Sequence, residues 1–336
     1  MKTSVIDIGL QWESAALTRA LSAAIQGEAA QVIVNTTGSS GIQKRVLLST
    51  EAIEVSAQLS NSEIGAKPGD VWSLLLPINH IAGLNVLARS IKLGSDVVGV
   101  NQVANFTAIV PTQLHRALFS DSKLLTHLQN CKSVLVGGSP ASKTLLDLAK
   151  ANGINVITTY GMTETSGGCV YDNKALPGVS VMVDESGRLK IKGPILATGY
   201  ENNQELWNKQ FKDGWFLTSD LGVVIKNEVQ IIGRADDVVI SGGENISLNA
   251  IEIELTANFP SANFLATAIS DPEWGQKICL ICDEQIDKEK IAHVLKEKLG
   301  KQFVPKEFLV VKQIPEIGIG KPDRVKASQL FIDKQR

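Results

Sequence analysis

The chain has 336 residues, 44% of them apolar and 20% charged, and its formal net charge is 33 − 35 = −2. A chain of this length can bury a large core, and the balanced charge excludes a strongly basic surface for nucleic acid. No apolar run approaches the roughly 18–20 residues of a membrane-spanning helix, and four cysteines are too few for a disulfide scaffold. We therefore expect a cytoplasmic protein with no nucleic-acid partner and no membrane insertion.

Up to about residue 233, short apolar runs alternate with helical stretches such as residues 142–153, which end on a glycine suited to a helix C-cap. Most of these runs have the composition of strands that are buried on both faces. The predicted strands cover residues 32–38, 71–77, 96–100, 106–111, 133–138 and 155–161. This alternation predicts an α/β fold, in which helices flank a mainly parallel sheet.

After Gly178 the apolar runs shorten and turn signals separate them, as in a small antiparallel β unit. The predicted strands of this unit cover residues 179–185, 187–193, 214–227 and 228–233. Beyond Gly-Arg-Ala-Asp-Asp at 233–237 the chain follows a smaller α+β pattern, with a helix predicted over 288–299. We therefore predict a large N-terminal domain, residues 1–234, and a smaller C-terminal domain, residues 235–336.

Cys279 and Cys282 form a Cys-x-x-Cys pair, a spacing that can serve redox chemistry or zinc. They lie in an apolar, β-rich run, where a spacing of three places the two side chains on opposite faces of a strand. No second Cys-x-x-Cys or pair of histidines accompanies them. We interpret both cysteines as small apolar residues of a buried strand.

A loop rich in hydroxyl groups and glycine follows the apolar run Val32–Asn35. It consists of Thr36, Thr37, Gly38, Ser39, Ser40, Gly41, Ile42, Gln43 and Lys44. Its backbone N–H groups, hydroxyls and single lysine are suited to a polyphosphate. The Gly-Lys-Ser/Thr ending of a Walker A loop is absent. Taken alone, a segment of this kind is more often a solvated surface loop.

A second polar segment, Tyr160-Gly161-Met162-Thr163-Glu164-Thr165, follows another apolar strand. A tyrosine at a strand end can stack on a base, Thr163 can bind a phosphate, and Glu164 is a hard oxygen ligand suited to Mg²⁺. A turn followed by a helix N-cap is the alternative.

Three further segments carry single charged residues beside glycines. Asp220, in Thr-Ser-Asp-Leu-Gly, can accept both hydroxyls of a ribose, and Arg234 in Gly-Arg-Ala-Asp-Asp can add a donor. Lys321 lies in Gly-Ile-Gly-Lys-Pro-Asp-Arg near the carboxyl end. In isolation, an aspartate in such a segment is usually a turn residue, and a glycine-flanked lysine is more often part of a surface loop.

Together and in this order, the five segments resemble the adenylate-forming superfamily, which contains acyl- and aryl-CoA ligases, peptide-synthetase adenylation domains and luciferases. The matching positions run from residue 36 to residue 324. The resemblance implies an enzyme that uses ATP, Mg²⁺ and coenzyme A. A carboxylate attacks the α-phosphorus of ATP and releases pyrophosphate; a thiol then attacks the acyl-adenylate and releases AMP. It also implies that the small C-terminal domain is mobile and rotates between the two half-reactions.

The resemblance assigns roles to the matching residues. The loop over the β- and γ-phosphates would consist of Thr36, Thr37, Gly38, Ser39, Ser40, Gly41 and Lys44. Gly138, Ser139 and Pro140 would lie along the adenine, with Tyr160 stacked on it and Gly161 in the same nucleotide-binding segment. Thr163 would contact the α-phosphate, Glu164 would hold Mg²⁺, and Asp220 and Arg234 would bind the ribose. Asp236 would be the hinge, Gly243 would line the pantetheine path, and Lys321 would bind the substrate carboxylate and the α-phosphate.

Two segments resemble o-succinylbenzoate–CoA ligases of menaquinone biosynthesis. Residues 76–84 contain His80 and are similar to the histidine motif near the acyl pocket of CoA ligases, and residues 110–114 read Val-Pro-Thr-Gln-Leu. Few residues precede the phosphate loop, as in some shortened bacterial succinylbenzoate ligases. His80 could orient the acyl group or be a packed polar residue. His115 and Arg116 are candidate partners for the succinyl carboxylate, although a solvated helix face explains them equally well.

Three positions depart from the usual pattern. Gln43 and Arg45 flank Lys44 where proline and glycine are common, and a bulky Arg45 could alter how the loop folds over phosphate. Ala250 replaces a frequent carboxylate in the small domain. Other open readings are an aryl- or fatty-acyl-CoA ligase, an enzyme that loads a carrier protein, a nucleotide-binding protein without catalysis, and a homodimer that covers apolar surface.

Overall fold

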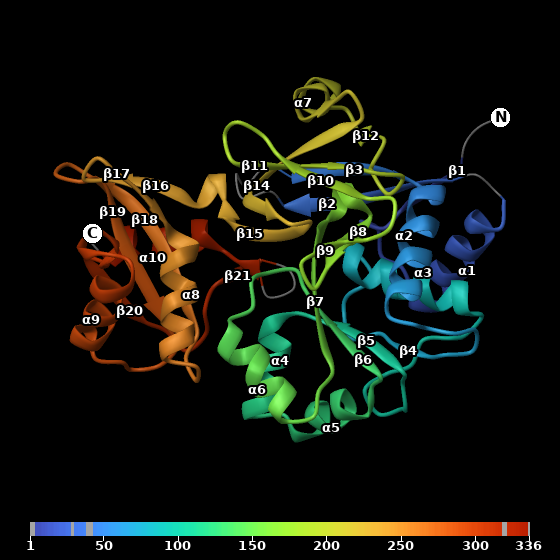
Figure 1. Ribbon diagram of the computed structural model, residues 1–336, viewed down its shortest axis with the longest axis horizontal. Coiled ribbons are helices and arrows are strands. Elements are labelled where there is room, and N and C mark those ends of the chain that lie inside the picture. Colours follow the sequence, from blue (N-terminus) through green and yellow to red (C-terminus); the bar gives the residue numbers. More distant parts are fainter. Residues whose placement is uncertain (1–3, 28–29, 38–42, 318–320, 335–336) are drawn as a thin grey trace.

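The computed structural model describes residues 4–27, 30–37, 43–317 and 321–334 (Figure 1). Helices accompany the strands along the whole chain. They are α1 (Ser14–Ile25), α2 (Thr50–Glu63), α3 (Ile81–Leu93), α4 (Pro111–Phe119), α5 (Ser122–Asn130), α6 (Lys143–Ala151), α7 (Gln204–Gln210), α8 (Leu248–Asn258), α9 (Lys288–Lys298) and α10 (Arg324–Lys334). The predicted α/β class is confirmed. No helix in the described ranges combines the length and apolar character needed to cross a bilayer.

A mixed central sheet organises most of the chain. Its strand order is β10 (Ser180–Val183), β11 (Arg188–Lys192), β14 (Trp215–Ile225), β15 (Glu228–Arg234), β9 (Lys174–Ala175), β8 (Gly167–Tyr171), β7 (Val156–Met162), β6 (Ser133–Val136), β5 (Phe106–Ile109) and β4 (Trp72–Ser73), with β13 (Phe211–Lys212) beside β14. Strands β4 to β7 are parallel. From β7 onward the neighbours pair antiparallel, so the predicted antiparallel unit continues the parallel part within one sheet.

A second, N-terminal sheet has the order β1 (Ser4–Asp7), β2 (Ala30–Thr37), β3 (Gln43–Ser49) and β12 (Gly199–Tyr200). Strands β2 and β3 form a hairpin in which Thr36 pairs with Lys44. Strand β12 pairs antiparallel with β3 through Tyr200 and Val46. A short segment from far along the chain therefore lies directly beside the end of the hairpin.

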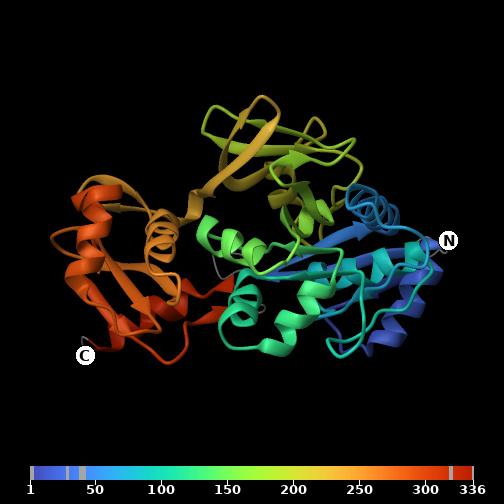
Figure 2. The same cartoon turned by 60° about the horizontal axis from the view of Figure 1, so that its bottom comes forward.

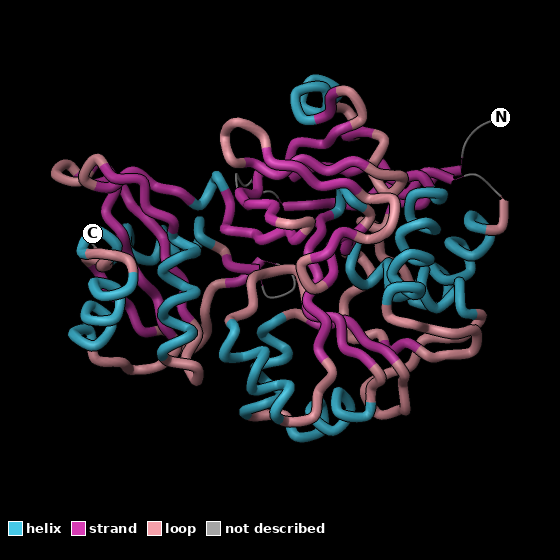
Figure 3. The backbone as a smooth tube through the Cα atoms, in the orientation of Figure 1, coloured by secondary structure: helices cyan, strands magenta, loops and turns pink. Residues whose placement is uncertain are grey.

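The C-terminal unit, residues 238–334, has a sheet of its own. The strand order is β17 (Glu244–Ser247), β16 (Val238–Ser241), β19 (Gly275–Cys282) and β18 (Phe264–Asp271), with β20 (Glu307–Val310) paired to β19. Helices α8 and α9 pack on one face of this sheet and α10 on the other. Figure 3 shows the helices of the chain in cyan and its strands in magenta. A separate small hairpin joins β21 (Glu316–Ile317) to β22 (Lys321–Pro322).

The two cysteines of the Cys-x-x-Cys pair confirm the interpretation as strand residues. Both are buried in β19; Cys279 packs against α10, whereas Cys282 packs in the core under α8 and α9. Burial raises the pKa of the Cys279 thiol to about 12, which leaves it uncharged and unreactive at neutral pH. Within the described ranges, no group of three or more His, Cys, Asp or Glu could hold a metal ion.

Short connections set the positions of the parts. Residues 235–237 form a single 3₁₀ turn between β15 of the central sheet and β16 of the C-terminal unit. Figures 1 and 2 show the C-terminal unit beside the larger part of the chain, with this turn as the link. Side-chain contacts also cross between them: His115 Nε2 lies 3.1 Å from the Pro260 carbonyl oxygen, and Thr144 Oγ1 donates to the Ala257 carbonyl at 3.4 Å. Asn249 Nδ2 on α8 donates to the Ile232 carbonyl of β15, also at 3.4 Å.

Candidate active site

The end of β7 is built by a close approach of two strands. A β-bulge interrupts the pairing of β7 with β8 at Tyr160 and Gly161. A Cβ atom added to Gly161 would lie 2.0 Å from the Gly167 carbonyl oxygen, so this position requires glycine. The 3₁₀ turn Thr163–Thr165 follows, and the Thr165 hydroxyl accepts from the Met162 N–H at 2.9 Å. The turn holds Thr163 and Glu164 buried.

Glu164 meets a tyrosine from the N-terminal sheet. The Tyr200 hydroxyl donates to Glu164 Oε1 at 2.7 Å, and Gln210 Oε1 lies at the same distance from that hydroxyl. Burial raises the pKa of Tyr200, and the negative charge of Glu164 raises it further, so the hydroxyl keeps its proton. The Lys44 ammonium lies 5.1 Å from the centre of the Tyr200 ring. Strand β12 thus brings Lys44 and Glu164 into one neighbourhood.

The arrangement around Glu164 fits Mg²⁺. Its Oε2 accepts no hydrogen bond from any residue that the structure describes. Magnesium is usually bound by one or two carboxylates together with substrate phosphates, not by a complete protein cage. A single oriented carboxylate near Lys44 matches that requirement.

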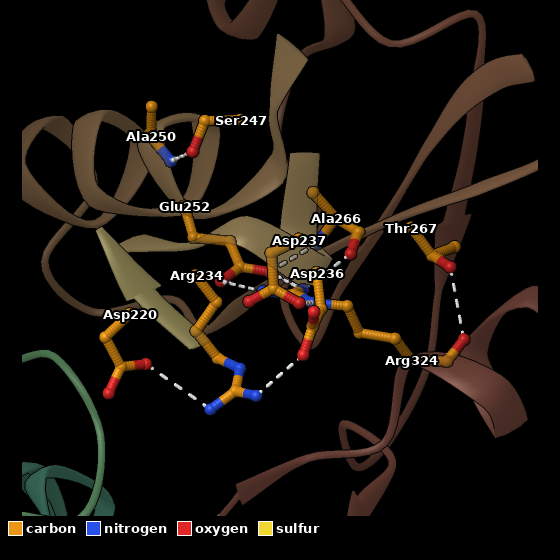
Figure 4. A network of polar contacts seen from close by, with 10 residues as sticks. All are labelled: Asp220, Arg234, Asp236, Asp237, Ser247, Ala250, Glu252, Ala266, Thr267 and Arg324. Atoms are coloured by element: carbon orange, nitrogen blue, oxygen red, sulfur yellow. Dashed lines mark hydrogen bonds and ion pairs between the residues drawn. The ribbon is translucent and has the colours of Figure 1, made fainter. Parts of the chain in front are cut away.

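Tyr160 and Asp220 form the other half of the site. The Tyr160 hydroxyl donates to Asp220 Oδ2 at 2.7 Å, and Arg234 Nη1 lies 3.3 Å from Asp220 Oδ1. Burial raises the pKa of Asp220 above its ordinary value, and the charges of Glu164 and Asp236 add to this, while Tyr160 and Arg234 oppose it. Arg234 Nη2 also contacts Asp236 Oδ2 at 2.8 Å (Figure 4).

Other predicted site residues lie at loop or helix ends. Gly138, Ser139 and Pro140 follow β6, which is parallel to β7, so they share its carboxyl edge with Tyr160. Gly138 has φ +85°, a left-handed conformation that favours glycine. His80 is the N-cap of α3. Gly243 has φ +83° in the turn between β16 and β17.

The predicted phosphate loop is described only at its two ends. Thr36 pairs with Lys44, and Thr37 with Gln43, whereas Gly38, Ser39, Ser40 and Gly41 lie outside the described residues. Lys321 lies in β22, where it pairs with Ile317.

The Arg45 side chain lies against neighbouring segments of the N-terminal sheet, whereas the loop whose folding it was expected to alter lies outside the described residues. Its Nη2 donates to Asp7 Oδ2 at 2.9 Å and its Nη1 to Asn35 Oδ1 at 3.3 Å, and its Nε contacts Glu201. These partners hold the guanidinium along the side of the N-terminal sheet. Arg45 therefore joins β1 and the residue after β12 to strand β3 of the hairpin.

The Ala250 departure is also explained locally. The Ala250 N–H donates to the side chain of Ser247, the N-cap of α8, at 3.2 Å. Position 250 therefore contributes a backbone hydrogen bond to the helix cap, and this bond does not depend on its side chain. The buried carboxylate of this helix comes two residues later, from Glu252, which contacts Arg324.

His115 engages the C-terminal unit through the Pro260 carbonyl, and its ring packs on Phe119 with centres 4.5 Å apart. The Pro-Thr-Gln-Leu segment has a structural role as well. Gln113 accepts from the Val110 N–H at 3.1 Å and donates to the Leu75 carbonyl at 3.0 Å, which ties α4 to the end of β4.

Sequence reasoning missed Arg89, which is only 4% exposed on α3. Its Nη2 donates to the Tyr171 hydroxyl at 3.2 Å, and its guanidinium lies 5.0 Å from the centre of the Trp72 ring. Its Nε has no hydrogen-bond partner among the described residues, and no carboxylate there pairs with it. The signal in the sequence was an arginine in a mainly apolar helix, whose other charged residue is Lys92.

Known proteins resemble this chain over most of its length. The AMP-binding enzyme family matches residues 7–201. A protein of Mycobacterium tuberculosis named probable 2-succinylbenzoate–CoA ligase is 34% identical over 327 residues, which cover 89% of this chain and 84% of that protein. A 2-succinylbenzoate–CoA ligase of Listeria monocytogenes is 28% identical over 325 residues, covering 88% and 69%.

The o-succinylbenzoate CoA synthetase from Bacillus subtilis, solved with the acyl-adenylate intermediate OSB-AMP, has a similar fold. It superimposes with a TM-score of 0.76 at 25% identity, covering 88% of this chain and 68% of that one.

Proposed function

Because this chain belongs to the family of AMP-binding enzymes, we propose that it joins 2-succinylbenzoate to coenzyme A at the expense of ATP. In the first step a carboxylate oxygen attacks the α-phosphorus of ATP, and the bond to pyrophosphate breaks. In the second step the thiol sulfur of coenzyme A attacks the acyl carbon, loses its proton, and AMP leaves. The observation that carries this proposal is the 34% identity to a succinylbenzoate ligase across 84% of that protein.

The site residues take roles that suit these steps. Tyr160 stacks on adenine beside Gly138, and Asp220 and Arg234 bind the ribose. Their existing contacts, Tyr160 to Asp220 at 2.7 Å and Asp220 to Arg234 at 3.3 Å, support this assignment because the three groups already share one place. Preorganised groups need no reorganisation when the nucleotide arrives.

The phosphates lie toward Lys44, Thr163 and Glu164. Mg²⁺ held by Glu164 would offset the charge of the pyrophosphate as it departs. Lys44 at the hairpin end contributes a second positive charge, and Lys321 binds the attacking carboxylate and the α-phosphate. Removing one such electrostatic contact typically costs about 3 kcal/mol, or roughly a hundredfold in rate.

We also propose that residues 1–234 and 235–336 act as two domains, with the hinge at Asp236. Support comes from the three-residue link between β15 and β16 and from the separate sheet of the C-terminal unit. Rotation at this hinge withdraws Lys321 after adenylation and brings Gly243 toward the path of the thiol.

Arg89 is the group that we assign to the second carboxylate of 2-succinylbenzoate. A buried cation without an anionic partner is costly, and a carboxylate ligand offsets that cost. Arg89 shares one face of α3 with Asn85, one turn earlier, and Asn85 Nδ2 donates to the Ser166 carbonyl at 2.6 Å. This face therefore lies against the segment that follows Glu164.

The function is tested by pyrophosphate release across a panel of carboxylic acids, followed by thioester formation with coenzyme A. We expect release with 2-succinylbenzoate and discharge of the adenylate by coenzyme A. Turnover of another aryl or fatty acid in its place would refute the substrate. An adenylate that coenzyme A cannot discharge would refute the second step.

The role of Arg89 has a separate test, which compares 2-succinylbenzoate with the same ketoacid lacking the ring carboxylate. Arg89→Met should raise KM for 2-succinylbenzoate by roughly ten- to a hundredfold, since a hydrogen bond to a charged group is worth about 1.5–3 kcal/mol. The KM for the monocarboxylate should stay unchanged. An equal loss with both acids would show that Arg89 only supports the fold.

We further propose that the enzyme works in the cytoplasm as a homodimer. All four cysteines are free and buried, which suits a reducing compartment. The edge strand β1 carries Val5, 57% exposed, and Leu10 follows at 63%. Sedimentation at micromolar concentration would reveal the dimer, and Leu10→Glu should favour the monomer.

A further inference from the structure

One arginine of the C-terminal unit is bound by carboxylates from two different segments. Arg324 Nε donates to Asp237 Oδ1 at 3.1 Å, and its Nη2 lies 3.3 Å from Asp237 Oδ2. On the other side, Nη2 donates to Glu252 Oε2 at 3.2 Å, and Nη1 contacts Glu252 Oε1 and the Ala266 carbonyl, the latter at 2.7 Å. Figure 4 shows Arg324 between these groups.

The network around Arg324 also includes backbone groups on both sides of the guanidinium. The Arg324 carbonyl accepts from the Thr267 hydroxyl at 3.1 Å, and Glu252 Oε1 accepts from the Ala266 N–H at 2.8 Å. All three guanidinium nitrogens are therefore engaged, and strand β18 is part of the same network. A planar guanidinium that is bound by two carboxylates has a fixed orientation.

The residues of this network lie next in the chain to Lys321 and to the proposed hinge. Arg324 comes three residues after Lys321, at the start of α10. Asp237 comes directly after the hinge residue Asp236. The two neighbouring aspartates bind different arginines: Asp236 contacts Arg234 at the ribose site, whereas Asp237 contacts Arg324.

We propose that Arg324 is a positioning residue for adenylation, because it fastens the segment that carries Lys321 to the hinge at Asp237. The contact of Arg234 with Asp236 crosses the hinge and has to rearrange when the unit rotates. The contacts of Arg324 lie on the moving side, so they persist and carry the Lys321 segment as part of one body. This inference rests on the proposed role of Lys321 in the adenylation step.

A purely structural role for Arg324 makes a different prediction. Loss of packing in the C-terminal unit would slow both half-reactions, because both use that unit. Loss of positioning slows only the step in which Lys321 takes part. The two half-reactions therefore separate the explanations.

The experiment measures adenylation by pyrophosphate release, and thioester formation from acyl-adenylate added directly. Four single variants of the full chain are compared: Arg324→Gln, Arg324→Lys, Lys321→Ala, and Asp283→Ala as the matched control. Asp283 accepts from Asn263 Nδ2 at 2.6 Å inside the same unit, without contact to the hinge. The double variant Arg324→Gln with Lys321→Ala completes the cycle.

We expect Arg324→Gln to slow adenylation about a hundredfold, the usual effect of a misplaced reacting group, and to leave thioester formation unchanged. Arg324→Lys should behave in the same way, since a point charge cannot replace the planar guanidinium. In the Lys321→Ala background, Arg324→Gln should cause no further loss. The Asp283→Ala control should leave both steps intact.

Two results would overturn the inference alone: an equal loss in both half-reactions, or a full additional loss in the Lys321→Ala background. If Lys321→Ala itself left adenylation intact, the proposed role of Lys321 would fall, and this inference with it.

Discussion

At the scale of single residues, the site depends on side chains that hold one another in place before any ligand binds. The Tyr200 hydroxyl fixes one oxygen of Glu164 at 2.7 Å, and the Tyr160 hydroxyl fixes one oxygen of Asp220 at the same distance. The sequence indicated Tyr160 and Glu164 from a polar segment that follows an apolar strand, and Asp220 from its Thr-Ser-Asp-Leu-Gly segment. It gave no sign of Tyr200 as their partner, because that contact forms only when β12 pairs with β3.

Tyr200→Phe should raise the Mg²⁺ concentration that adenylation requires by roughly tenfold, the lower range for loss of a group that orients a metal ligand. The reason is that Glu164 loses the donor that orients it. The measurement is the adenylation rate against Mg²⁺ concentration. Binding of ATP without Mg²⁺ serves as the control and should be unchanged; a parallel loss there would point to a damaged fold.

Asp220 gives the site a pH dependence. Burial raises the pKa of Asp220, so its carboxyl takes up a proton at a higher pH than an exposed aspartate, whose pKa is about 3.9. We propose that the ionised form of Asp220 accepts the ribose hydroxyls, so AMP affinity should fall as the pH is lowered through this raised pKa. Folding has the opposite sign: the protonated form favours the native state, and this stabilisation is lost as pH rises through the raised pKa.

AMP titrations at several pH values check this expectation. Asp220→Asn should bind AMP more weakly at neutral pH and lose the acid-side decline. If the decline persisted in that variant, another group would be responsible for it.

At the scale of elements, the buried parallel strands were the most predictable part. The runs at 106–111 and 133–138 contain β5 and β6, the run at 155–161 matches β7 to within one residue, and the helix predicted at 288–299 contains α9. The run at 96–100 forms no regular strand and contributes one bridge, between Ser73 and Val98. Its valines are partly buried against neighbouring clusters, so apolar character there reflects packing and not strand pairing.

The β7–β8 bulge offers a test of how far the site depends on its strands. Gly161→Ala places a methyl group against the Gly167 carbonyl, and overpacking of this kind costs about 1–3 kcal/mol. We expect a lower Tm together with loss of adenylation, because Tyr160 and Thr163 flank the change. Gly99→Ala is the matched control, since nothing lies within 4 Å of the added atom. Equal behaviour of the two variants would contradict this explanation.

At the scale of the whole molecule, two hydrogen bonds among the described residues hold the C-terminal unit against the helices of the larger part. They join His115 to Pro260 and Thr144 to Ala257. Neither was accessible from the sequence, because contacts between distant loops and helices leave no local pattern. The proposed rotation has to break both.

A reversible crosslink tests that rotation. Cysteines introduced as Thr144→Cys and Ala257→Cys should form a disulfide that locks the observed arrangement. We expect complete turnover to stop while one half-reaction continues, and reductant should restore the other. The single-cysteine variants are the controls, and the native cysteines should not interfere because all four are buried. Full turnover in the locked protein would argue against rotation.

The brevity of the link at residues 235–237 has a kinetic consequence. In the proposed adenylation step the link ties the segment that carries Lys321 to the proposed nucleotide site. The encounter of Lys321 with substrate would then be an intramolecular event, with an effective concentration fixed by the link and not by the amount of enzyme. Adenylation per molecule therefore keeps the same rate on dilution. If the chain were severed after Asp237, the same chemistry would become bimolecular, and its rate would follow the concentration of the added fragment.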